Sequence, residues 1–202
     1  MRRRTDQRGQ AFTLEAFTAS LLLIGAIIFA LQVTAVTPLT ASTSSQHIEN
    51  QEHQVASGLL DSAIQNGSLR AAVLYWNDSA GTFYGVDHSE GTYVEGGPPG
   101  LTFGAMVNRT FRDRGIAINV NVWYVGADGD LREEQMVHFG TPSDNAVSAR
   151  RTLTLFDDDR LTAPGASFGE PLSEARTFYA PDRSPDSGVF NVVRVEVVAW
   201  RM

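Results

Sequence analysis

The chain contains neither cysteine nor lysine, and both absences restrict what it can be. Without cysteine it can form no disulfide and no thiolate metal site. All 16 of its basic residues are arginine, although lysine is ordinarily among the commonest residues of proteins. The 23 acidic residues outnumber the arginines and give a formal net charge of −7. A surface this acidic repels phosphate and therefore argues against nucleic acid as a partner.

The same composition indicates an environment. An acidic, lysine-free surface suits concentrated salt, in which long-range repulsion between carboxylates is screened. We therefore expect a halophilic archaeal source. A GC-rich genome, which favours arginine over lysine, is the alternative explanation, and the two are compatible.

Charged residues are also missing from a long stretch near the N-terminus. Residues 17–36 carry no charged side chain, and a helix of about 20 residues spans about 30 Å, the thickness of the hydrocarbon core of a bilayer. Four arginines precede this stretch, and the next basic residue is Arg70. The positive-inside rule then predicts a cytoplasmic N-terminus and an external C-terminal part.

A cleaved secretory signal and an uncleaved anchor are the two alternatives for this segment. The apolar part of a secretory signal usually has about 7–15 residues and ends in small residues, whereas the stretch here is longer and no such site follows. An uncleaved anchor accounts for the length and the flanking charge. It does not account for Phe12-Thr13-Leu14-Glu15, which stands between the basic tail and the apolar stretch.

The rest of the chain predicts an α+β fold. Pro38 is expected to kink or break the first helix. Apolar residues then recur at helical spacing up to Asn66-Gly67, which predicts an amphipathic stalk. Its apolar positions are Ile48, Val55, Leu59, Leu60, Ala63 and Ile64. Residues 69–76 predict a further short helix, with a strand as the alternative.

Turn-forming residues dominate 77–100, which predicts a long surface loop with a short hairpin around 82–86 and 92–94. Residues 101–114 predict a short amphipathic helix closed by Gly115. Strict alternation over 116–124 predicts a strand that turns at 127–130. Further strands are expected at 131–139, 147–156 and 189–200, with a loop at 157–185. The sum is a long N-terminal hydrophobic helix that continues into a stalk, followed by a small, mostly antiparallel β-sheet head.

Arg8-Gly9-Gln10, followed by an apolar helix, resembles the class III signal of type IV pilins and archaellins. Phe12-Thr13-Leu14-Glu15 is similar to the FTLxE start of mature bacterial pilins and pseudopilins. The resemblance implies that a prepilin peptidase cleaves after Gly9 at the cytoplasmic face, so that Gln10 becomes the first residue. It also implies that the hydrophobic helices of several subunits bundle in a filament core, where Glu15 neutralises the N-terminal amine of a neighbour.

One position departs from the family pattern. Cleavage after Gly9 makes Glu15 the sixth mature residue, whereas bacterial members have this glutamate fifth. Cleavage after Gln10 would restore the fifth position but would put glutamine where the family has glycine. Archaeal members often begin with glutamine and need no glutamate, which favours Gly9/Gln10. The resemblance covers residues 2–40 only.

Small residues let membrane helices approach closely. The candidate subunit-packing residues are therefore Glu15, Ala19, Gly25, Ala26 and Ala30. Two alternatives stay open: small residues are common in all membrane helices, and Glu15 could reach the headgroups instead of pairing with an amine.

Three sequons make Asn66, Asn77 and Asn108 candidate glycosylation sites, in keeping with an exported domain.

No motif predicts catalysis, a cofactor, a metal or a small-molecule substrate, so we do not expect an enzyme. The four histidines are scattered, and no Gly-x-Ser-x-Gly frame surrounds any serine. Asp157-Asp158-Asp159 could hold a hard cation such as Ca²⁺, but a solvated turn is the favoured interpretation.

These observations predict a structural, pilin-like minor subunit of an archaeal type IV pilus-type filament or of its assembly system. Its partners would be the lipid bilayer, other pilin-like subunits and a prepilin peptidase. The expected parts are a basic leader (1–9), a filament-core helix (10–38), a stalk (39–66) and an extracellular head (67–202). The alternative is an uncleaved, single-span anchor with an extracytoplasmic binding domain; an anchored enzyme ranks last.

Overall fold

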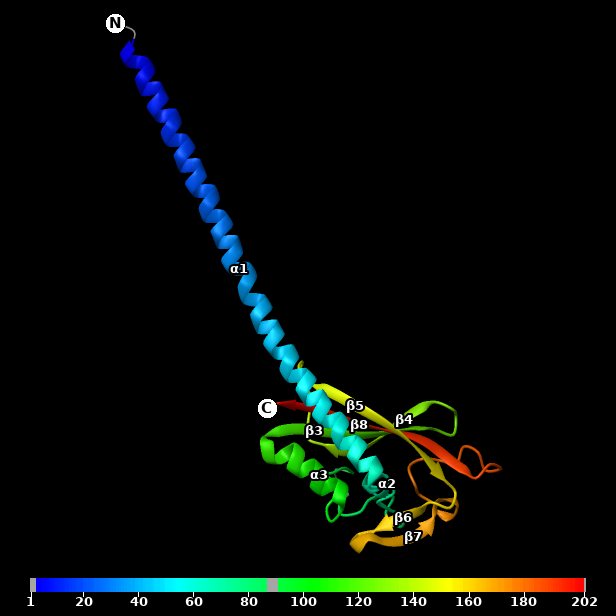
Figure 1. Ribbon diagram of the computed structural model, residues 1–202. Helices are drawn as coiled ribbons and strands as arrows, with labels where there is room; N and C mark the ends of the chain where they lie inside the picture. The colour runs from blue at the N-terminus through cyan, green and yellow to red at the C-terminus, as the bar shows by residue number, and fades with distance from the viewer. Residues whose placement is uncertain (1–2, 87–90, 202) are drawn as a thin grey trace. The chain divides into compact units, whose positions relative to one another are not determined.

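A computed structural model describes residues 3–86 and 91–201, without the side chains of residues 3–11, 33–45 and Ala166. The chain forms two compact units, Met1–Ile48 and Glu49–Met202 (Figure 1). The boundary between them falls within a single helix, α1 (Arg3–Gln65). Although the sequence predicts a kink or break at Pro38, α1 does not end there.

The second unit is built on a four-stranded antiparallel sheet, which confirms the predicted α+β fold. The strand order is β4-β3-β8-β5. The strands are β3 (Ile116–Val125), β4 (Leu131–His138), β5 (Val147–Phe156) and β8 (Val189–Arg201). The last strand of the chain thus lies in the middle of the sheet and hydrogen-bonds to both β3 and β5.

Helices cover one face of this sheet (Figure 1). They are the last part of α1, α2 (Ser68–Val73) and α3 (Thr102–Thr110), which is followed by the short turn η1 (Arg112–Arg114). Ala56, Leu60 and Ala63 of α1 are fully buried, because positions three and four apart face the same side of a helix. Ile48 and Ile64, expected on the same apolar face, are exposed.

The prediction of a hairpin between 82–86 and 92–94 is wrong. Instead β1 (Trp76–Asn77) pairs with β2 (Thr82–Phe83). Tyr93 forms a parallel bridge with Val137 of β4 and extends the edge of the main sheet. The segment was expected to be a surface loop, but Phe83, Tyr93 and the backbone at 96–98 are buried.

The loop predicted for 157–185 also contains regular structure. It holds a second hairpin of β6 (Arg160–Ala163) and β7 (Ser167–Pro171), with short turns η2 (Pro164–Ala166) and η3 (Leu172–Glu174). The hairpin lacks the alternation that marks a strand. It is held from outside, since the Thr162 N–H donates to the Leu74 carbonyl at 2.8 Å.

The connection 139–146 joins β4 at one edge of the main sheet to β5 at the other. The side chain of Asn119 holds its start, because Oδ1 accepts the Phe139 N–H at 2.8 Å and Nδ2 donates to the Gly140 carbonyl at 2.9 Å. The Phe139 ring lies against Trp200, with ring centres 6.5 Å apart. These contacts explain why an asparagine is buried within β3.

Candidate functional site

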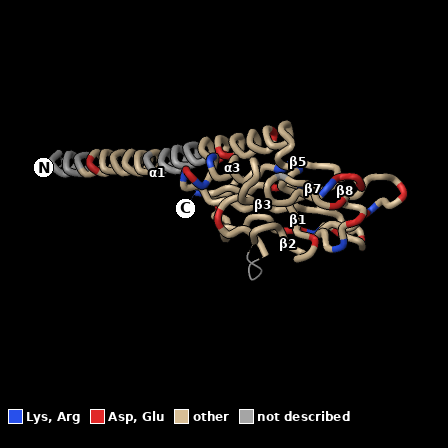
Figure 2. The backbone as a smooth tube through the Cα atoms, turned by 90° about the horizontal axis from the view of Figure 1, so that it is seen from below, with Lys and Arg blue, Asp and Glu red and all other residues tan. Residues whose placement is uncertain are grey.

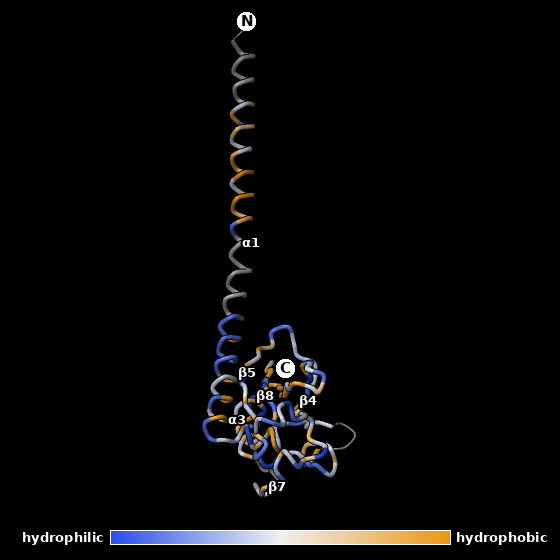
Figure 3. Tube along the Cα trace, turned by 90° about the vertical axis from the view of Figure 1, so that its right-hand side faces the viewer, coloured by the Kyte–Doolittle hydropathy of each residue, from blue (hydrophilic) through white to orange (hydrophobic). Residues whose placement is uncertain are grey.

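The first candidate site is the apolar part of α1, Phe12–Gln32. Its most apolar 18-residue window has a mean hydropathy of 2.2 (Figure 3), and none of the residues 12–32 is buried. The eleven large apolar side chains are exposed by between 50% (Ile27) and 75% (Leu22). By length and composition the segment can cross a membrane. A helix that is apolar on all sides requires lipid or other helices around it.

Two hydroxyl side chains within this segment are hydrogen-bonded to carbonyls of the helix itself. Thr18 Oγ1 donates to the Leu14 carbonyl at 3.0 Å, and Ser20 Oγ donates to the Ala16 carbonyl at 2.7 Å. Such bonds hide hydroxyl groups from an apolar surrounding. Glu15 is the single ionisable residue between Phe12 and Gln32.

The candidate packing residues all lie in this exposed segment. Glu15, Ala19, Ala26 and Ala30 share one side of the helix, because their spacings are multiples of a helical turn to within a fraction of a residue. Gly25 faces another side and has no atom within 4 Å of an added Cβ. The processing residues Gly9 and Gln10 lie outside the residues whose side chains are described.

A second feature is the attachment of α1 to the sheet by two ion pairs. Arg151 of β5 donates to both carboxylate oxygens of Asp61, each at 2.6 Å. This hydrogen bonding lowers the pKa of Asp61. Arg201 of β8 donates to Glu52 Oε1 at 2.5 Å, and Glu52 is buried. The helix is thereby tied to both β5 and β8 within the second unit.

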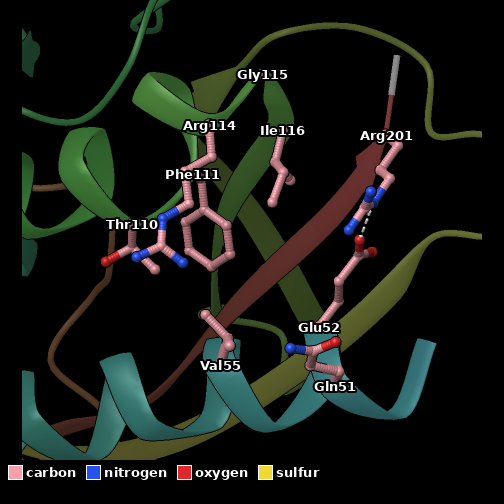
Figure 4. Close-up of a pocket in the computed structure, with 9 residues that line it drawn as sticks. All are labelled: Gln51, Glu52, Val55, Thr110, Phe111, Arg114, Gly115, Ile116 and Arg201. Carbon is pink, nitrogen blue, oxygen red and sulfur yellow. Dashed lines mark hydrogen bonds and ion pairs between the residues drawn. The ribbon is translucent and has the colours of Figure 1, made fainter. Parts of the chain in front are cut away.

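A pocket of about 320 Å³ opens beside the Glu52–Arg201 pair (Figure 4). Its floor is apolar and consists of Val55, the fully buried Phe111, and Ile116. Arg114 stands at its rim, and its guanidinium has no hydrogen-bond or ion-pair partner among the described residues. No pattern in the sequence marks this pocket, because the pocket depends on the register that sets Ile116 opposite Arg201.

The aspartate run at 157–159 lies in the turn that follows β5. Asp159 pairs with Arg70, and its Oδ2 accepts the Phe156 N–H at 2.8 Å. Among the described residues, no group of three or more histidine, aspartate or glutamate side chains is placed to hold a metal ion.

The three candidate glycosylation sites differ in their surroundings. Asn66 is exposed at the end of α1, where its Oδ1 accepts the Ser68 N–H at 2.9 Å. Asn77 is half-buried, and its Oδ1 accepts the Ser79 N–H at 3.1 Å. Asn108 is half-buried, accepts the Gly97 N–H at 3.1 Å and packs closely on Gly96.

We expect a glycan on Asn66 and none on Asn108 of the folded protein. A sugar on Asn108 would have to displace the loop that this side chain holds, whereas Asn66 already faces solvent. Glycopeptide mass spectrometry of the protein from a haloarchaeal host measures both occupancies, with Asn66→Gln as the control that removes the first site. Higher occupancy at Asn108 than at Asn66 would contradict this expectation.

Fold and exposed helix together define a class of protein: an α+β domain that follows an N-terminal helix long and apolar enough to cross a membrane. Within that class, residues 8–199 match a family of unknown function (DUF7288), and the chain belongs to this family. The match begins at Arg8 and covers both the apolar helix and the head. No curated protein and no solved structure matches the chain.

Proposed function

We propose that the chain is a pilin-like minor subunit of an archaeal type IV pilus-type filament or of its assembly system. One observation carries this proposal. The N-terminal part of α1 exposes apolar side chains on every side, while residues 49–65 of the same helix contribute to the core of an α+β head. A subunit that bundles through one end of a helix and displays a domain at the other needs this division.

The role is structural and follows from the chemistry of α1. Before assembly, lipid covers the segment Phe12–Gln32; after assembly, the helices of other pilin-like subunits cover it. The side that carries Ala19, Ala26 and Ala30 permits close approach between helices. Glu15 on that side pairs with a cation, for which the free amine of a processed neighbour is the natural candidate.

The proposed role also implies on which side of the membrane each part of the chain lies. The basic tail stays in the cytoplasm, where a prepilin peptidase cleaves between Gly9 and Gln10, and the head lies outside the cell. The acidic, lysine-free composition is consistent with a halophilic archaeon. A single-pass anchor that is never cleaved would share the topology but would keep residues 1–9.

Gly9→Val is expected to abolish maturation, because a β-branched side chain cannot take the place of the glycine that such peptidases require. Mass spectrometry of the N-terminus should find wild-type chains that begin at Gln10 and variant chains that begin at or near Met1. Gly25→Ala is the matched control and should mature normally, since an added Cβ meets nothing within 4 Å.

The decisive comparison is made in cells with an active prepilin peptidase. If the wild-type chain still carries its arginine-rich tail there, the pilin-like role is wrong and the uncleaved anchor remains.

A further inference from the structure

The register of the main sheet gives the head two opposite ends. At one end Ile116 lies opposite Arg201, close to η1. At the other end β3 turns into β4 after Val125, and Phe156 lies opposite Val189. We call these the Arg end, defined by Arg114 and Arg201, and the Asp end, defined by the turns at 126–130, 156–159 and 182–187.

At the Arg end, the pocket combines positive charge with an apolar floor (Figure 4). The Arg114 side chain is exposed and unpaired among the described residues. Arg201 pairs with Glu52, yet 64% of its side chain remains exposed, so the guanidinium has donors to spare. A carboxylate entering between the two arginines would accept charge-assisted hydrogen bonds, while its methylene group rests on Val55 and Phe111.

At the Asp end, negative charge is left uncompensated (Figure 2). Five aspartates there form no ion pair within the described chain: Asp130, Asp157, Asp158, Asp182 and Asp186. The arginine of these turns, Arg183, has no carboxylate partner among the described residues and donates to the Ala127 carbonyl at 2.8 Å. The carboxylates therefore outnumber the free cations.

The turn at 157–158 brings unpaired carboxylates close together. Asp157 Oδ1 is buried without a hydrogen-bond partner, and Asp158 is exposed. Partial desolvation, followed by the nearby carboxylates of Asp182 and Asp158, raises the pKa of Asp157. A cation brought to this turn would relieve the repulsion.

We propose that two copies of the head dock head to tail, with the 157–158 turn of one copy seated in the Arg114–Arg201 pocket of the next. Charge complementarity identifies this occupant. The pocket carries two arginines, and the 157–158 turn of the same chain carries two aspartates that form no ion pair within the described residues. The contact is heterologous, so it repeats from copy to copy, and in a filament it forms an open helical array. In this respect the inference rests on the proposed filament role. In concentrated salt only charges in direct contact attract strongly, and the apolar floor helps to exclude water from that contact.

Because the chain has no cysteine, only the introduced cysteines can form disulfides between copies. Gln51 is exposed at the pocket, and Ser173 is exposed beside the turn, where its N–H donates to the Asp157 carbonyl at 3.2 Å. Full-length Gln51→Cys and Ser173→Cys chains with different tags would be co-expressed and oxidised in membranes. Thr152→Cys, exposed in the middle of β5, replaces Ser173→Cys as the matched control.

Head-to-tail docking predicts a mixed disulfide dimer of Gln51→Cys with Ser173→Cys and none with Thr152→Cys. Adding Arg114→Glu to the first chain should lower the mixed dimer about tenfold or more, as expected for a like-charge contact. Asp158→Arg in the second chain should then restore it, because the pair is reversed rather than lost.

Three outcomes would overturn the docking: a Thr152→Cys dimer of equal yield, a Gln51→Cys homodimer in excess of the mixed one, or a mixed dimer that Arg114→Glu leaves unchanged. The N-terminus of the same samples separates the two proposals. Chains that begin at Gln10 but do not cross-link contradict only the docking, and chains that cross-link but keep residues 1–9 contradict only the pilin-like role.

Discussion

Gly104→Ala is expected to destabilise the head by about 3 kcal/mol, whereas Gly58→Ala is expected to stabilise it by about 1 kcal/mol. The first glycine lies in α3 directly under the buried loop at 96–98. A Cβ at this position would come within 2.8 Å of the Pro98 carbonyl carbon and even closer to its oxygen. Both neighbours are backbone atoms, so neither can move away without shifting the loop.

Gly58 tests the same substitution without the close approach. It is exposed in the interior of α1, and an added Cβ meets nothing within 4 Å. Only the helix propensity changes there, and alanine is the better helix former. Urea denaturation of the full-length chain in detergent, followed by tryptophan fluorescence, would compare both variants with the wild type. Midpoints that move in the same direction would show that the loop does not rest on α3 as described.

The contrast between these glycines illustrates what the sequence could and could not reveal. Local patterns located the main strands, since the alternation over 116–124 and the turn residues at 127–130 act between near neighbours. Gly115 was predicted to close a helix, and it follows η1 with a left-handed φ of 70°. In each case the physical cause lies within a few residues of its effect.

Tertiary contacts set the parts that were missed. Gly96-Gly97-Pro98 was expected in a surface loop because glycine and proline usually mark loops. The structure uses Gly97 for close packing instead, since a Cβ there would lie 2.7 Å from the Gly104 Cα. The central position of β8 is likewise invisible in a local pattern, because it depends on pairing with both β3 and β5, which are distant in the sequence.

Of the two candidate sites, the apolar helix could be predicted from the sequence and the pocket could not. An apolar helix is a composition signal, and Phe12–Gln32 is identified by counting uncharged residues. The pocket at the Arg end combines Glu52, Arg114 and Arg201, which come from three separate elements. Only the packing of α1 on the sheet and the register of β3 with β8 bring them together, so no spacing rule could have selected them.

Asp78→Asn is expected to destabilise the head by about 2–3 kcal/mol at neutral pH, because it weakens several hydrogen bonds to one carboxylate. Asp78 Oδ1 accepts the Arg176 N–H at 2.9 Å, the Thr177 N–H at 2.6 Å and the Thr177 hydroxyl at 3.0 Å. The Thr177 carbonyl in turn accepts Trp76 Nε1 at 3.0 Å. These bonds fix the segment that delivers Phe178 and Tyr179 to the aromatic core. An asparagine keeps the shape but replaces one acceptor by an NH₂ group that opposes the same donors.

The pH dependence separates this explanation from a simple packing defect. Partial burial alone would raise the pKa of Asp78, but the hydrogen bonds from Thr177 and Arg176 outweigh it and lower the pKa below its usual value. A carboxylate with a lowered folded-state pKa contributes stability above the pKa of the unfolded chain, about 3.9, and loses it as the pH falls through the folded-state value. The difference between wild type and Asp78→Asn should therefore be largest at neutral pH and shrink below about pH 4. Asp186→Asn, which changes an exposed and unpaired aspartate, should show little difference at either pH. Thermal unfolding followed by near-UV circular dichroism would report on the aromatic core directly. If the wild type remained more stable than Asp78→Asn by the same amount down to pH 2, the charge of Asp78 would not be what holds this segment.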